Sequence, residues 1–146
     1  MNLALHLAKG AAAQGEVPVG AVIVGDGTLL GWGANCRHAH GDVLGHAEIV
    51  ALRAAANALK DWRIERSTVY VTLEPCIMCT GALLQARVAR LVFACRDPKA
   101  GAVRSLFALG DDPRLPFRMQ ITEGLLGDES RHLLQSFFEN LRKKRQ

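Results

Sequence analysis

The sequence predicts an α/β fold in which helices cover a mixed sheet of about five strands. Segments rich in β-branched residues alternate with Ala- and Leu-rich segments, which is typical of sheets layered with helices. One strand, helix and strand follow each other between Val69 and Cys95, and we expect this unit to be a right-handed parallel crossover. The chain of 146 residues is long enough for one proper core, so we expect a single domain over residues 1–146.

The chain is expected to begin with a helix and a strand pair. Ala-rich residues near the N-terminus predict a short helix that ends at Gln14-Gly15, because glycine commonly ends helices. β-branched residues over 17–24 predict a strand, with Pro18 near its start. The turn at 25–27 leads to a second strand over 28–32, so these two strands should form an antiparallel hairpin.

The middle of the chain is expected to contain two helices around one strand. A polar loop over 35–45 precedes an Ala-rich helix from about His46 to Leu59. The residues at 67–73 predict a strand. Glu74-Pro75 then turns into a helix from about Cys76 to Arg87, since proline suits a helix start.

The last part of the chain should add two strands and a terminal helix. Apolar residues predict a strand over 90–95 and a short strand over 119–122, separated by a loop rich in glycine, proline and charge. Asp128 opens the terminal helix, whose acidic start and basic end complement the helix dipole. Apolar residues recur along it at helical spacing, and such a face usually packs against the core. They are Leu133, Leu134, Phe137, Phe138 and Leu141.

Charge and hydropathy restrict the partners and the compartment. The net charge is +4, which favours an anionic partner, and a run of four basic residues at 142–145 lies at the end of the chain. No apolar stretch approaches the roughly 18 residues that span a bilayer, and the N-terminus lacks the pattern of a signal peptide. We therefore expect a cytoplasmic protein without a membrane segment, in which Cys36 and Cys95 stay free and reduced.

Two short clusters, His46-Ala47-Glu48 and the segment from Pro75 to Cys79, predict a catalytic zinc site. Cys76 and Cys79 are three residues apart at a helix start, where both side chains share a face and can bind one ion. His46 supplies a third ligand, so the fourth coordination position stays open for water, as catalytic zinc requires. Glu48 is not needed as a ligand.

The spacing of the first cluster indicates how the metal and Glu48 are arranged. His46 and Glu48 are two residues apart, so a metal held by His46 must lie beyond the end of the helix. Two helix N-termini would then point at the ion and help to keep the thiolates deprotonated. Glu48 beside the water would act as a proton shuttle, which predicts hydrolysis at an electrophilic ring carbon that bears an exocyclic amine.

A structural zinc site is the main alternative, and it would belong to a non-catalytic RNA-binding protein or partner subunit. Structural zinc usually takes a fourth protein ligand. Such a site would have no use for Glu48. The candidates for the fourth ligand are Cys36, His38, His40 and Cys95.

At these clusters the sequence resembles the zinc-dependent nucleoside and nucleobase deaminases, which share an H-x-E…P-C-x-x-C pattern. The resemblance is closer to the bacterial tRNA-specific adenosine deaminases, and the blocks that carry it lie at 16–22, 46–49, 70–79 and 96–101. It implies a three-layer α/β/α fold of the cytidine deaminase type and a homodimer. It also implies hydrolytic deamination of the wobble adenosine of a tRNA anticodon to inosine.

The resemblance assigns roles to individual residues. It implies that His46, Cys76 and Cys79 bind one Zn²⁺ per subunit and that Glu48 is the proton shuttle. It implies that Asn35 binds the base in the pocket, although a turn asparagine that only satisfies its own loop is the alternative. The other residues that it places near the tRNA anticodon stem-loop are Arg96, Asp97, Lys99 and Phe138.

Some points remain open after the resemblance. The residues 43–45 before the zinc histidine and the pair Cys36-Arg37 depart from the family pattern, and the chain begins well inside the first helix of the family, so that a short first helix or a different start is expected. The basic residues at 142–145 either contact RNA or are simply solvated. A small-molecule deaminase acting on guanine or cytidine is the alternative enzyme of the same fold.

Overall fold

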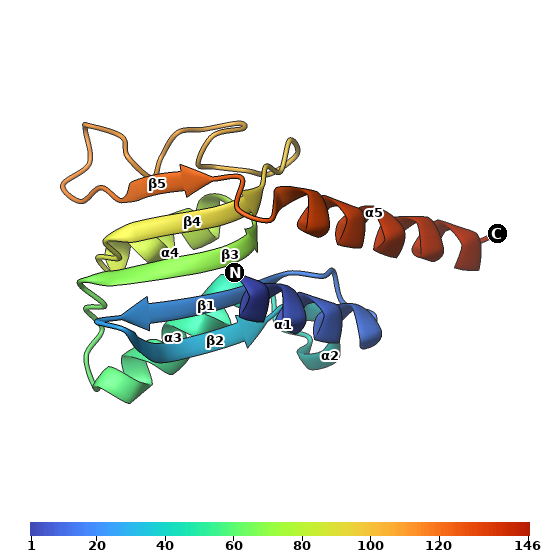
Figure 1. Cartoon of the computed structure of the whole chain (residues 1–146), viewed down its shortest axis with the longest axis horizontal. Helices are drawn as coiled ribbons and strands as arrows, with labels where there is room; N and C mark the ends of the chain where they lie inside the picture. Colours follow the sequence, from blue (N-terminus) through green and yellow to red (C-terminus); the bar gives the residue numbers. More distant parts are fainter.

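The computed structural model describes residues 1–146, and its centre is one five-stranded sheet (Figure 1). The strand order is β2-β1-β3-β4-β5. β1 pairs antiparallel with β2 and β3, whereas β3 and β4, and β4 and β5, are parallel pairs. The mixed sheet, the hairpin and the parallel crossover are therefore confirmed. The strands are β1 Gly20–Gly25, β2 Thr28–Ala34, β3 Ser67–Leu73, β4 Arg90–Cys95 and β5 Gln120–Glu123.

Helices cover both faces of the sheet, which confirms the α/β/α arrangement. α3 and α4 contact each other behind the sheet in Figure 1, and α1 lies on the front face, where it contacts α5. None of the helices is both long and apolar enough to cross a membrane. The helices are α1 Asn2–Ala13, α2 Arg37–His40, α3 Ala47–Leu59, α4 Ile77–Gln85 and α5 Gly127–Lys144.

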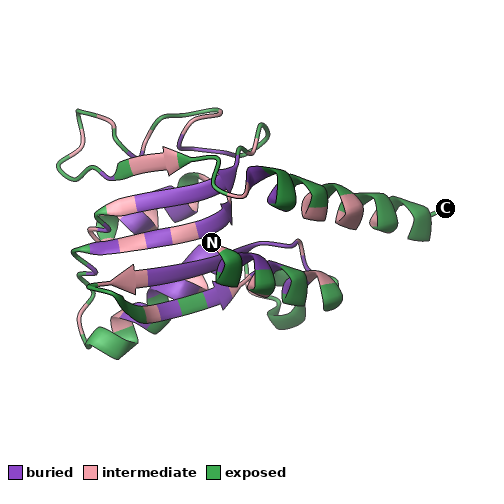
Figure 2. Cartoon of the chain, in the orientation of Figure 1, coloured by how far each residue is buried: buried purple, intermediate pink, exposed green.

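The core fills the space between the central strands and the helices α3 and α4, as the buried ribbon in Figure 2 shows. Two glycines of β2 let α3 lie directly on the sheet. A Cβ at Gly31 would lie 2.6 Å from the carbonyl oxygen of Ala51, and a Cβ at Gly33 would lie 2.7 Å from that of Ala47. Because neither glycine has a side chain, the first turn of α3 comes close to the end of β2, beside the cluster described below.

Two local predictions need correction in the segments around β1 and β2. The first strand was expected over 17–24, but sheet pairing begins only at Gly20. The Val19 N–H bonds the Val17 carbonyl oxygen at 2.8 Å, so it is not available to a neighbouring strand, although the Val19 carbonyl oxygen still accepts a hydrogen bond from the Asn35 N–H at 3.0 Å. The loop predicted over 35–45 also contains the short helix α2.

The prediction that the apolar face of α5 packs into the core is wrong for most of the helix. Only Gly127 and Ser130 of α5 are buried, and its C-terminal part extends past the sheet (Figures 1 and 2). α5 begins beside the end of β4 and runs away from the sheet, so only its first turn packs against the strands (Figure 1). Leu133 and Phe137 are therefore half-buried in a shallow groove shared with Ala12 of α1.

Candidate active site

Two helix starts bring three metal-binding side chains together. His46 and Cys76 are the residues immediately before the first turns of α3 and α4, and both have extended backbones. His46 Nδ1 lies 3.7 Å from Cys76 Sγ and 3.5 Å from Cys79 Sγ. The three ligand atoms lie within 4.8 Å of one another, and they are the only such cluster in the protein. The geometry therefore provides a metal site with one nitrogen and two sulfur donors.

The four candidates for an additional protein ligand stay outside this cluster. Cys36, His38, His40 and Cys95 do not join the three ligand atoms. Cys95 is buried beside β3 instead, where its Sγ lies 3.5 Å from the carbonyl oxygen of Thr72. With three protein ligands, the site has the composition of an open catalytic centre rather than that of a closed structural one.

The pKa values of the two cysteines are shifted in opposite directions. Hydrogen bonding with Cys79 lowers the pKa of Cys76 to about 5 although burial acts in the opposite direction, and the backbone N–H groups of Cys79 and Met78 add to the effect. The same bond, together with burial, raises the pKa of Cys79. One thiolate is thus already stabilised at the start of α4, and a cation that binds both sulfur atoms would displace the remaining proton.

Glu48 is in the first turn of α3 and is 4% exposed. It is not one of the three clustered ligands, but it lines the same cavity as His46 and Cys76. Burial raises the pKa of Glu48 to about 7, while its own backbone N–H acts in the opposite direction. A carboxyl group with a pKa near neutrality can both accept and donate a proton, which is the property that a general acid–base needs.

The cavity beside the ligands has a volume of about 230 Å³. Asn35 and Asp97, two of the predicted substrate residues, line it together with Arg37. Apolar side chains of Val17 and Leu73 line it as well. This small cavity, with apolar walls and a few polar groups, is suited to a planar ring of nucleobase size.

The other three predicted substrate residues lie outside the cavity. Arg96 pairs with Glu123, with its Nε and Nη2 2.9 Å and 2.8 Å from the two carboxylate oxygens. Lys99 and Phe138 line a second groove along α5, which also contains Arg142. The structure thus places Asn35 and Asp97 in the cavity and Lys99 and Phe138 in the groove, while Arg96 lies in neither and is paired with Glu123.

Glu74 is a residue of the site that sequence reasoning treated only as part of a turn. It is 2% exposed, and its carboxylate accepts hydrogen bonds from the backbone N–H groups of Asp97 (2.9 Å), Val103 (3.1 Å), Arg104 (2.6 Å) and Ser105 (2.8 Å). The hydroxyl of Ser105 donates another. Burial by itself would raise the pKa of Glu74, but these hydrogen bonds outweigh it and lower the pKa. Glu74 therefore fixes the loop that carries Asp97.

Glu16 is a second buried carboxylate that sequence reasoning did not single out. Its side chain is fully buried. Its Oε2 accepts a hydrogen bond from Nδ2 of Asn35 at 3.2 Å, and its Oε1 accepts one from the backbone N–H of Ala39 at 2.7 Å. Asn35 is therefore held by Glu16, and it does not simply satisfy the polar groups of its own loop. The only sign of Glu16 in the sequence is an acid at the start of the β-branched run that precedes β1.

Comparisons with known proteins agree over the whole chain. Residues 1–142 match the sequence model of the MafB19-like deaminase family. A tRNA-specific adenosine deaminase of Haemophilus influenzae is 44% identical over 146 residues, which cover 99% of this chain and 84% of that protein. A solved structure from studies of A-to-I editing by tRNA:A34 deaminases at the wobble position is 40% identical, with a TM-score of 0.88 over 92% of this chain and 97% of that chain.

A guanine deaminase from Nitrosomonas europaea has the same fold at greater distance. It is 26% identical, with a TM-score of 0.77 over 93% of this chain and 81% of that chain. Both the identity and the TM-score are lower than for the tRNA:A34 deaminase structure.

Proposed function

Because this chain belongs to the MafB19-like deaminase family, we propose that it converts adenosine to inosine at the wobble position of a tRNA anticodon. The observation that carries the proposal is the likeness to a tRNA-specific adenosine deaminase over 99% of the chain. The cluster of His46, Cys76 and Cys79 beside Glu48 supplies the chemistry. The lower identity to a guanine deaminase favours RNA over a free base as the substrate.

His46, Cys76 and Cys79 would hold one zinc ion. Their donor atoms are one imidazole nitrogen and two sulfur atoms, the set that zinc takes in sites with an open fourth position. When bound, zinc supplies a Lewis acid that lowers the pKa of a water molecule to near neutrality. The starts of α3 and α4 add positive dipole ends, which favour the thiolate forms of the two cysteines.

Glu48 carries the protons of the reaction. It takes a proton from the attacking water and delivers it to the ring nitrogen next to the carbon that bears the amine. A second proton passes through Glu48 to the amine, which leaves as ammonia, and the ring keeps a carbonyl oxygen. Asn35 holds the base through its side-chain amide, and the apolar wall formed by Val17 and Leu73 excludes bulk water from the ring.

The decisive experiment uses a minimal anticodon stem-loop with adenosine at the wobble position. The zinc-loaded protein is incubated with this RNA, and its nucleosides are analysed by mass spectrometry. We expect inosine from the wild type. Ammonia released from free guanine or cytidine, with no inosine from the RNA, would instead identify a small-molecule deaminase.

We further propose that the chain acts as a cytoplasmic homodimer. Apolar side chains are exposed beside the site, at Ile77 on the first turn of α4 and at Leu106 and Phe107 in the loop held by Glu74. The Ala102 N–H bonds the Pro75 carbonyl oxygen at 2.9 Å, which joins this loop to the start of α4. Exposed apolar groups of this kind favour association. Light scattering should give twice the 15.8 kDa of one chain, and a mass of one chain would exclude the dimer.

The basic end of α5 is proposed to bind the phosphates of the RNA. Lys99, Arg142 and Arg145 line one groove together with Phe138, so positive charge and an aromatic ring lie side by side. Ending the chain after Leu141 should reduce the slope of log affinity against log salt by up to about three, at roughly 0.7 to 0.9 per phosphate contact. The affinity for the stem-loop is measured at several salt concentrations.

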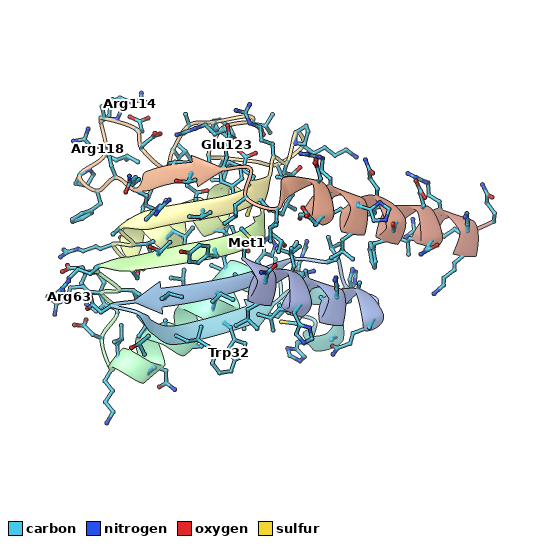
Figure 3. All side chains as sticks on the ribbon, in the orientation of Figure 1. Met1, Trp32, Arg63, Arg114, Arg118 and Glu123 are labelled. Carbon is cyan, nitrogen blue, oxygen red and sulfur yellow. The ribbon has the colours of Figure 1, made fainter.

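The matched control for this truncation removes positive charge from the opposite end of the sheet. Arg114 and Arg118 lie there, far from α5, as Figure 3 shows. Changing both to glutamine should leave the slope as it is in the wild type. An unchanged slope in the truncated chain would instead show that the basic residues at 142–145 are only solvated.

A further inference from the structure

We infer that Glu16 is a positioning residue, which fixes the side-chain amide of Asn35 so that its oxygen is presented to the substrate as a hydrogen-bond acceptor. The inference rests on the proposed function, since it concerns how the nucleoside is held in the cavity that Asn35 lines.

Glu16 is a fully buried carboxylate with no cationic partner. No arginine, lysine or histidine forms an ion pair with it, and its only hydrogen bonds come from Asn35 and from the backbone of Ala39. Burying a carboxylate with so few partners is costly, and an apolar side chain of similar size would fill the same space at lower cost. The acid at this position therefore requires a reason other than packing.

The reason follows from the direction of the Asn35 hydrogen bond. The hydrogen bond runs from Nδ2 of Asn35 to Oε2 of Glu16, so the amide nitrogen is the atom of Asn35 that faces the Glu16 side chain. Oδ1 then points away from Glu16. Oδ1 accepts no hydrogen bond from the protein, and it is not among the buried atoms that lack a partner. An unpaired oxygen that remains accessible, on a residue lining the cavity, is free for an N–H or O–H donor of the nucleoside.

The second oxygen of Glu16 determines how a glutamine at this position would be oriented. Oε1 is fixed by the Ala39 N–H at 2.7 Å, and that backbone group requires an acceptor. In Glu16→Gln the side-chain oxygen would stay with Ala39, and the new NH₂ group would face Asn35. Asn35 would then have to turn its own oxygen toward Gln at position 16 and its NH₂ into the cavity. The substitution thus replaces an acceptor in the cavity by a donor.

The test is the kcat/KM for inosine formation in the anticodon stem-loop, measured for Glu16→Gln. We expect a loss of about tenfold or more, because a substrate donor would meet a donor of the protein. Zinc content and melting temperature should stay close to the wild type. Glu129→Gln, the same change at an exposed position of α5, is the matched control and should keep the wild-type rate.

Two double variants distinguish an effect of Glu16 that acts through Asn35 from a general loss of structure. In an Asn35→Ala background, Glu16→Gln should change the rate by less than about twofold, because its only route of action is gone. Asn35→Asp alone would place two carboxylates face to face and should be severely impaired. The pair Glu16→Gln with Asn35→Asp restores both a donor toward position 35 and an acceptor in the cavity, so it should be more active than Asn35→Asp alone.

Three results would overturn the inference: a wild-type rate in Glu16→Gln, a loss that persists in the Asn35→Ala background, or no gain in the pair over Asn35→Asp. If Glu16→Gln alone does not fold, the comparison of the pair with Asn35→Asp decides. Failure of the proposed function is distinct, because the wild-type protein itself would then make no inosine.

Discussion

Replacing Glu48 by alanine is expected to lower the rate of inosine formation by about 100- to 10,000-fold while the metal stays bound. The carboxyl group of Glu48 lines the substrate cavity but lies outside the cluster of His46, Cys76 and Cys79. Its loss removes the group that carries both protons and leaves every metal ligand in place. The rate is measured by mass spectrometry of nucleosides from the stem-loop, and zinc by atomic emission on the same sample.

Two controls make the Glu48 result specific. Glu48→Gln keeps the size of the buried side chain but cannot take up a proton as a carboxylate does, so it should be nearly as inactive as the alanine variant. Glu129→Ala, at an exposed position of α5 outside the proposed RNA groove, should leave the rate unchanged. Wild-type activity in Glu48→Ala would exclude the proposed proton transfer, and loss of zinc in that variant would make Glu48 part of the metal site.

Replacing Cys79 by alanine is expected to remove both the metal and the activity. Cys79 is fully buried in the first turn of α4, and it provides one of only three clustered donors. With two donors left, tight zinc binding is lost. A ligand that binds only the folded state stabilises it by about 4 kcal/mol at a thousandfold excess over its Kd, so the variant should also melt at a lower temperature.

The matched control is Cys36→Ala, because Cys36 is another free cysteine that lies outside the cluster. It should keep zinc and activity. Treating the wild type with a strong chelator should reproduce the behaviour of Cys79→Ala, and added zinc should restore the treated wild type but not the variant. Full zinc content in Cys79→Ala would show that the metal is held elsewhere.

The sequence predicts the sheet well where strands are short, apolar and fully enclosed. The bounds expected for β3 and β4, 67–73 and 90–95, agree with the structure, since turn residues or charges end both apolar runs. The start of β1 was placed too early because β-branched residues continue through Val17 and Val19, while pairing depends on a neighbouring strand. The helix α5 has a regular apolar face, but it runs away from the end of the sheet, so most of that face meets no strand.

The sequence predicts the metal ligands of the candidate site, but it does not predict the residues that support them. The spacing of Cys76 and Cys79, and the position of His46 at a helix start, are local features that can be recognised in the sequence. Glu16 and Glu74 form hydrogen bonds with residues that are 19 to 31 positions away in the sequence. Only the fold shows which groups these carboxylates contact. The same limit applies to Lys99 and Phe138, whose shared groove depends on where α5 lies.

Glu74 and Cys76 are separated only by Pro75, and this short connection couples two equilibria. Cys76 is part of the metal cluster, and Glu74 holds the loop that carries Asp97 into the cavity. Any shift of this rigid segment moves both. Binding of the metal and binding of the nucleoside are therefore coupled, and by thermodynamic linkage each changes the affinity for the other by the same factor. Zinc affinity measured with and without the stem-loop would give this factor directly.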